Sequence, residues 1–155
     1  MSSPSQTITD DAIIEEIEIA APPERVWRAL TDSAELTLWW NEEEGQRDVT
    51  WALEPRLGGR WRSTGYDESC GAWEMLGEIL EWMPPHRLVY TWEQTGTRGH
   101  GSGGRTVVTY QLTATAKGTR LRLTHSGFGT NAEARDSYRH GWPTVLGLLR
   151  RHCER

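Results

Sequence analysis

The chain has 155 residues, of which 36% are hydrophobic and 25% charged, and its formal net charge is −5. These values fit a globular domain and exclude a chain that is disordered throughout. The Lys and Arg residues are scattered, so the sequence lacks the clustered cationic face that nucleic acid or an anionic membrane surface requires. We therefore expect neither nucleic acid nor a membrane among the partners.

The first residues predict no ordered element. Residues 1–11 are rich in Ser, Thr and Asp, and they lack the positive start and apolar run of a signal peptide. We expect them to form a disordered tail before a single domain over residues 12–155. Cys70 and Cys153 match no metal-binding spacing and are expected to be free thiols in a reducing compartment. These features predict a cytoplasmic protein.

The N-terminal part of this domain predicts one strand followed by two short helices. Hydrophobic and acidic residues alternate over residues 13–21 ("IIEEIEIAA"), as they do in a half-buried strand. Two prolines then open residues 22–30 ("PPERVWRAL"), and proline is tolerated in the first turn of a helix because its missing N–H needs no partner there. A second short helix is predicted to end at Trp39 or Trp40.

The middle of the chain, to about residue 126, predicts strands joined by turns. Hydrophobic and polar residues alternate in each strand, so one face of the resulting sheet is apolar. Between two of these strands, residues 94–104 are so rich in glycine that backbone entropy favours a flexible loop. The predicted strands are residues 49–55, 60–63, 73–83, 87–93, 106–114 and 119–126.

The last twenty or so residues change to a helical period. Tyr138, Trp142, Val145 and Leu149 recur at helical spacing, which predicts one long amphipathic helix. Consecutive strands joined by short turns imply an antiparallel sheet. The apolar face of that sheet and the apolar stripe of the helix must be buried against each other. The order of elements therefore predicts an α+β domain in which a curved sheet holds a C-terminal helix.

Five spaced motifs resemble those of the START-like superfamily (SRPBCC, or Bet v type). They are "APPERVWRALTDSAELTLWW", "LGGRW", "GEILEWMPPHRLVYTW", "TRLRLTHSGF" and "HGW" followed by a leucine-rich end. The most similar branch is that of the homologues of the activator of heat-shock protein 90 ATPase, and the resemblance covers residues from about 13 to 153. It implies a helix-grip fold: a seven-stranded antiparallel sheet around a long C-terminal helix, two short helices after the first strand, and a cavity between sheet and helix.

Nine tryptophans stand against a single phenylalanine, and these rings either fill a core or line a cavity. A buried indole N–H needs a partner, so many indoles fit more easily around a partly open pocket of roughly a few hundred cubic ångströms than in a solid core. Such walls suit a flat hydrophobic or aromatic molecule. The expected ligand-binding residues are Trp39, Trp61, Trp73, Trp92, Tyr110, His125, Tyr138 and Trp142, with His125 as the polar anchor.

The adjacent tryptophans at the end of the second helix are expected to have different roles. Neighbouring residues on a helix point about 100° apart. Trp40 lies four residues after Leu36 and is assigned to the core, whereas Trp39 is assigned to the ligand. Together with the loop over residues 94–104, the region of this pair is expected to control access to the cavity.

Catalytic, metal and cofactor motifs are not found. The sequence has no G-x-S-x-G, H-E-x-x-H or phosphate-binding loop, so we predict no cofactor and no metal. The leading hypothesis is non-enzymatic binding of a hydrophobic small molecule. A second hypothesis, implied by the resemblance, is a stress-response role as a co-chaperone-like domain acting on heat-shock protein 90, although the co-chaperone's additional N-terminal domain has no counterpart here. A third is a cyclase or hydrolase that uses His125 or Glu81 as a base.

Overall fold

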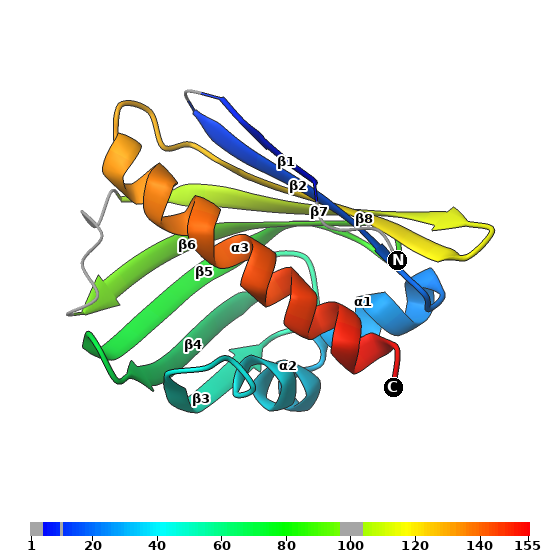
Figure 1. Ribbon diagram of the computed structural model, residues 1–155, viewed down its shortest axis with the longest axis horizontal. Coiled ribbons are helices and arrows are strands. Elements are labelled where there is room, and N and C mark those ends of the chain that lie inside the picture. Colours follow the sequence, from blue (N-terminus) through cyan, green and yellow to red (C-terminus); the bar gives the residue numbers. More distant parts are fainter. Residues whose placement is uncertain (1–4, 10, 97–103) are drawn as a thin grey trace.

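The computed structural model describes residues 5–9, 11–96 and 104–155. Within these residues, an eight-stranded antiparallel sheet curves around one long helix, α3, and two short helices pack beside the C-terminal part of α3 (Figure 1). The strand order is β1-β2-β8-β7-β6-β5-β4-β3. The elements are β1 (Ser5–Ile8), β2 (Ala12–Ile19), α1 (Pro23–Thr31), α2 (Ser33–Trp40), β3 (Gln46–Leu53), β4 (Arg60–Asp67), β5 (Gly71–Met83), β6 (Arg87–Gly96), β7 (Thr106–Thr115), β8 (Gly118–Ser126) and α3 (Ala132–Cys153).

The core lies between the sheet and α3. Every second residue of β2 is buried, and the same alternation runs through β7 and β8, because successive side chains of a strand point to opposite faces. The buried stripe of α3 includes Trp142, Val145 and Leu149. The helix-grip architecture expected from the sequence is therefore confirmed.

The expectations for the N-terminus and for the strand count need correction. The resemblance implied seven strands, and residues 1–11 were expected to form a disordered tail. Ser5–Ile8 instead form β1, which pairs antiparallel with β2 from Ser5 opposite Glu16 to Ile8 opposite Ile13. The physical reason is that β2 would otherwise be an edge strand with unpaired backbone groups, which a short preceding segment can satisfy.

Helices α2 and α3 begin at a capping side chain, whereas α1 begins at a proline and has no side-chain cap. Pro23 opens α1 directly after Pro22. The side chain of Asp32 accepts a hydrogen bond from the Glu35 backbone N–H (3.0 Å) at the start of α2. Asn131 does the same for the Ala134 N–H (3.0 Å) at the start of α3. Each cap satisfies a backbone donor that the first turn of a helix leaves without a partner.

A partly buried ion cluster joins the three helices. Glu35 of α2 contacts Arg25 (2.7 Å) and Arg28 (2.8 Å) of α1, and it also contacts His152 of α3 (2.8 Å). Burial alone would raise the pKa of Glu35, but hydrogen bonds from His152 and Arg25 outweigh that effect and hold the pKa below its ordinary value of 4.5. The cluster fixes the relative positions of the helices that close this end of the sheet.

Replacing Glu35 by glutamine is expected to lower the free energy of unfolding by about 1–2 kcal/mol at pH 7, between the values typical of exposed and of buried ion pairs. Because the pKa of Glu35 is lowered in the folded state, this contribution is present above pH 4.5 and is lost as the pH falls further. Urea unfolding at pH 7 and pH 3.5 measures both effects. The control is Glu18→Gln, which removes an exposed pair with Arg120 and should change stability by less than about 0.5 kcal/mol.

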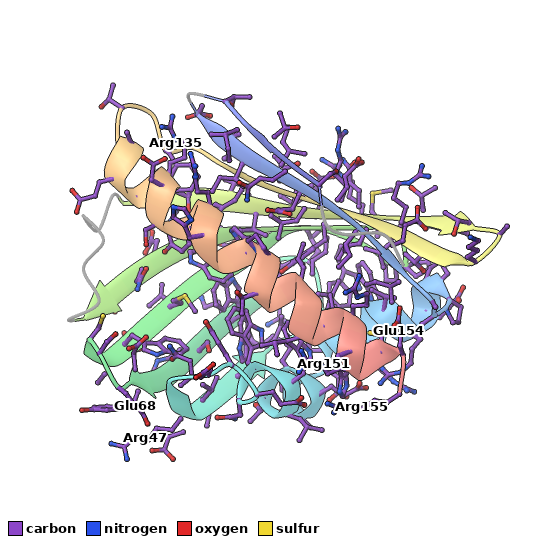
Figure 2. The ribbon with its side chains drawn as sticks, in the orientation of Figure 1. Arg47, Glu68, Arg135, Arg151, Glu154 and Arg155 are labelled. Carbon is purple, nitrogen blue, oxygen red and sulfur yellow. The ribbon has the colours of Figure 1, made fainter. Side chains whose placement is uncertain are left out.

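The C-terminal end of α3 carries a group of charged side chains that includes Arg151, Glu154 and Arg155 (Figure 2). Glu154 accepts a hydrogen bond from the Ala20 backbone N–H (2.8 Å) just after β2, and Arg155 pairs with Glu42 just after α2 (2.7 Å). These contacts attach the end of α3 both to the sheet and to the segment that follows α2.

Candidate functional site

A partly enclosed cavity of about 70 Å³ lies between α3 and the sheet. Aromatic rings form much of its wall, and polar atoms lie among them. Its volume is smaller than the few hundred cubic ångströms expected from the sequence, because a continuous cluster of buried side chains, tryptophan rings among them, fills the space between sheet and helix. The lining residues are Trp40, Glu43, Met75, Trp92, Gln94, Ser137, Tyr138, Gly141, Trp142 and Val145.

A short hydrogen-bonded chain crosses the cavity wall from strand to helix. Trp92 of β6 donates its indole N–H to the hydroxyl of Tyr138 on α3 (3.3 Å), and this hydroxyl donates to Oε1 of Gln94 (2.6 Å). The first of these hydrogen bonds satisfies a buried indole N–H. The second positions the Gln94 side chain, which also lines the cavity. The wall is therefore apolar with a few oriented polar groups, as is common for small-molecule sites.

His125 lies fully buried behind this wall, and both of its ring nitrogens are engaged. Its Nδ1 accepts the indole N–H of Trp142 (3.0 Å), and its Nε2 lies 2.7 Å from the hydroxyl of Thr106. That hydroxyl donates to the backbone carbonyl of Trp92 (3.0 Å). The network therefore assigns the proton of a neutral imidazole to Nε2, because an indole N–H can only donate.

Burial lowers the pKa of His125 from its ordinary value of 6.5 to about 3, so the ring is neutral at pH 7. His125 does not line the cavity, and neither nitrogen is available to a ligand. The structure therefore gives no support to the expectation that it anchors a polar group of the ligand. Strand alternation correctly directed the side chain inward, but Trp142 and Tyr138 lie over it.

Trp61 is a core residue rather than a cavity wall. Its ring lies 4.9 Å from that of Trp51 with an interplanar angle of 15°, and 4.8 Å from that of Trp92. Its indole N–H donates to the Thr91 carbonyl (3.0 Å) across the sheet. The ring fits there because its opposite residue on β5 is Gly77, which has no side chain. The prediction of Trp61 as a lining residue fails for this reason.

Trp40 belongs to the core as expected but also lines the cavity, whereas Trp39 does not take the ligand-facing position assigned to it. Trp39 is fully buried, its indole N–H donates to the Ala29 carbonyl of α1 (2.9 Å), and it does not line the cavity. Trp40 lines the cavity and packs against Trp51 at 5.5 Å. Two adjacent residues of a helix do face different surroundings, but α2 turns its Trp39 side toward α1 and its Trp40 side toward α3.

Two further predicted ligand residues also lie outside the cavity lining. Trp73 donates its indole N–H to Gln46 (2.8 Å) and lies over Gly65, near the end of the sheet. Tyr110 is buried, forms a hydrogen bond with Tyr90, and lies deeper in the core. Of the eight expected residues, the cavity brings together Trp92, Tyr138 and Trp142.

The cavity also includes residues that the sequence did not single out as ligand-binding. Ser137, Gly141 and Val145 extend the helical stripe of Tyr138 and Trp142 by three or four residues, and this spacing was the available signal. Met75 and Gln94 are opposite each other on β5 and β6, a register that the sequence alone does not specify. The full set of missed residues is Trp40, Glu43, Met75, Gln94, Ser137, Gly141 and Val145.

Glu81, the other candidate base, is not part of the cavity. A β-bulge between Ile79 and Glu81 shifts the register of β5 against β6, and the Glu81 carboxylate pairs with Arg87 (3.0 Å) on the half-exposed side. Glu81 and His125 therefore do not form a shared site.

Within the described part of the chain, no group of three acidic, histidine or cysteine side chains could hold a metal ion. The greater part of the predicted access loop, residues 97–103, lies outside the described residues.

Comparison with known proteins identifies relatives by family and by fold. The family model of Activator of Hsp90 ATPase homolog 1-like proteins matches residues 20–154. A Rhodobacter sphaeroides protein of 27% identity has a TM-score of 0.80, with 98% of this chain and 96% of that chain covered. A Mesorhizobium loti protein has 29% identity and a TM-score of 0.71 over 91% and 95% of the chains, and a Chromobacterium violaceum protein has 25% and 0.77 over 94% and 99%.

No curated protein matches the chain. Among the described residues, none of the helices has both the length and the apolar character needed to cross a membrane.

Proposed function

We propose, from the premise that this chain belongs to the family of Activator of Hsp90 ATPase homolog 1-like proteins, that it binds a small hydrophobic or aromatic molecule between sheet and helix. Binding involves no covalent chemistry. The observation that carries the proposal is the partly enclosed cavity walled by Trp40, Trp92, Tyr138 and Trp142. Aromatic walls with a few oriented polar groups favour a flat apolar ligand over a charged one.

The size of the cavity limits the ligand. A volume of about 70 Å³ holds roughly five to seven waters at 10–15 Å³ each. A ligand with one ring therefore fits best, and Met75 is the lining residue best able to adjust its shape, since methionine has three rotatable bonds. The acidic side chain of Glu43 at the cavity makes an anionic ligand unfavourable.

Gly141 offers a direct test, because it lines the cavity and a Cβ atom added there has no neighbour within 4 Å. Gly141→Leu is expected to place its side chain in the cavity and to weaken binding of single-ring aromatic compounds at least tenfold. Isothermal titration calorimetry measures the affinity, and the fluorescence of the lining tryptophans provides a second signal.

The matched control is Gly147→Leu, in the same helix. A Cβ atom at residue 147 also has no neighbour within 4 Å, but Gly147 does not line the cavity, so ligand affinity should be unchanged. Both variants replace a helical glycine and should gain helix propensity of up to about 1 kcal/mol. Equal affinities of the wild type and Gly141→Leu would place the ligand elsewhere, and no binding of any compound in the panel would refute the proposal.

The family description favours one second candidate, a co-chaperone-like interaction with heat-shock protein 90. This candidate predicts that the full chain, added at saturating concentration, changes the ATP turnover of the chaperone. An unchanged rate would remove it and would leave the ligand-binding proposal intact, because the two activities are measured independently.

A further inference from the structure

Two buried polar groups beside the cavity have no hydrogen-bond partner. The indole N–H of Trp51 on β3 and the hydroxyl of Ser63 on β4 are both enclosed and unpartnered, and Ser63 is fully buried. An unpaired polar group in a protein interior costs about as much free energy as a lost hydrogen bond. Such groups are rare in folded proteins, and two together require an explanation.

The two groups occupy neighbouring positions on the inward face of the sheet. Trp51 is directly opposite Ser63, Ser63 is opposite Met75, and Met75 is opposite Gln94. Side chains directly opposite each other in an antiparallel pair have Cβ atoms about 5 Å apart. Met75 and Gln94 line the cavity. The unpartnered pair therefore continues the row of side chains that forms the cavity floor, with Ser63 one strand and Trp51 two strands beyond Met75.

Resting on the proposed function, we propose that Trp51 and Ser63 are the polar end of the ligand site and bind a neutral carbonyl oxygen. The ligand displaces the flexible Met75 side chain and extends the cavity to this pair. An indole N–H can only donate and a serine hydroxyl is able to donate, so the group that satisfies both is an acceptor with two lone pairs. Among the described lining residues there is no cationic side chain, and Glu43 is acidic, which disfavours a carboxylate.

The free protein provides a first test. Because the Ser63 hydroxyl has no partner, Ser63→Ala removes an unsatisfied group and loses only one oxygen atom from the core. The variant is expected to unfold at the same urea concentration as the wild type or at a higher one. A clearly lower midpoint would show that the hydroxyl is hydrogen-bonded in the free protein, and it would overturn the proposal.

Binding of two matched probes provides the second test. Acetophenone carries a carbonyl group, and cumene has nearly the same shape without it. We expect the ratio of their affinities for the full chain, measured by calorimetry, to fall about tenfold in Ser63→Ala, the change that corresponds to one hydrogen bond. Trp51→Phe, which keeps a ring but loses the N–H, should lower the ratio similarly. Ser126→Ala, a serine on β8 outside the cavity lining, should leave it unchanged.

The outcomes separate the two proposals. If both probes bind and the ratio is the same in the wild type, Ser63→Ala and Trp51→Phe, the cavity binds apolar molecules but the carbonyl site is refuted. If Gly141→Leu abolishes binding of both probes while Ser63→Ala lowers only the affinity for acetophenone, both proposals are supported. If neither probe binds the wild type, the carbonyl site is refuted, and the proposed function fails with it only when no single-ring compound of the panel binds.

Discussion

Replacing Gly77 by alanine is expected to lower the free energy of unfolding by about 3 kcal/mol or more, the upper end of the range for an overpacked core. A Cβ atom at residue 77 would lie 1.8 Å from the Thr91 carbonyl oxygen and 2.4 Å from Nε1 of Trp61. These two atoms form a hydrogen bond with each other. The added methyl group therefore forces apart two strands and displaces a tryptophan in the centre of the aromatic core. Urea unfolding followed by circular dichroism measures the loss.

The control for this substitution is Gly147→Ala on α3, where an added Cβ atom has no neighbour within 4 Å. That variant should be as stable as the wild type or more stable by up to about 1 kcal/mol, because alanine has the higher helix propensity. A Gly77→Ala protein with wild-type stability would mean that Trp61 can leave its place over β5 at little cost, contrary to the packing described above.

Stability is expected to fall by about 2 kcal/mol between pH 7 and pH 5 because of His125. The folded protein keeps this ring neutral, with a pKa of about 3, whereas in the unfolded chain the pKa is near 6.5. Between these pH values the unfolded state binds a proton that the folded state does not. The contribution of the neutral His125 ring to the free energy of unfolding is therefore complete above pH 6.5 and decreases as the pH falls toward 3. Urea unfolding at pH 7, 6 and 5 measures the slope.

His125→Asn tests whether this residue causes the slope. Asparagine does not titrate and can still accept the Trp142 N–H, but it loses the contact with Thr106. The variant should be less stable than the wild type at pH 7 and should lose most of the pH dependence between 7 and 5. The control, His140→Gln, changes an exposed residue and should keep the wild-type slope. A slope that survives in His125→Asn would contradict a buried neutral ring.

The sequence predicts the faces of the strands well, because alternation depends only on neighbouring residues. His125, Trp61 and Tyr110 point inward as expected. Whether an inward ring fills the core or borders the cavity depends instead on residues distant in the sequence. Trp61 belongs to the core because Gly77 lies opposite, and His125 is covered because Trp142 reaches it from α3.

Features that depend on pairing register could not be predicted either. The bulge before Glu81 turns that carboxylate toward Arg87, although strict alternation would direct it inward. The first strand forms because β2 offers it an open edge, and nothing in residues 5–8 alone indicates this. The spacing of Tyr138 and Trp142 correctly predicts that both lie on the cavity side of α3, because the helical period can be recognised without knowing which residues pack against the helix.

The adjacent tryptophans of α2, Trp39 and Trp40, link ligand binding to the packing of the helices. Trp39 is held by the Ala29 carbonyl of α1, and the neighbouring Trp40 forms part of the cavity wall, with their rings 5.4 Å apart. The position of Trp40 in the cavity wall therefore depends on α1, although α1 does not itself line the cavity. A molecule that displaces Trp40 would also disturb the contact between α1 and α2. Binding in the cavity and separation of α1 from α2 are therefore two equilibria linked by one coupling free energy.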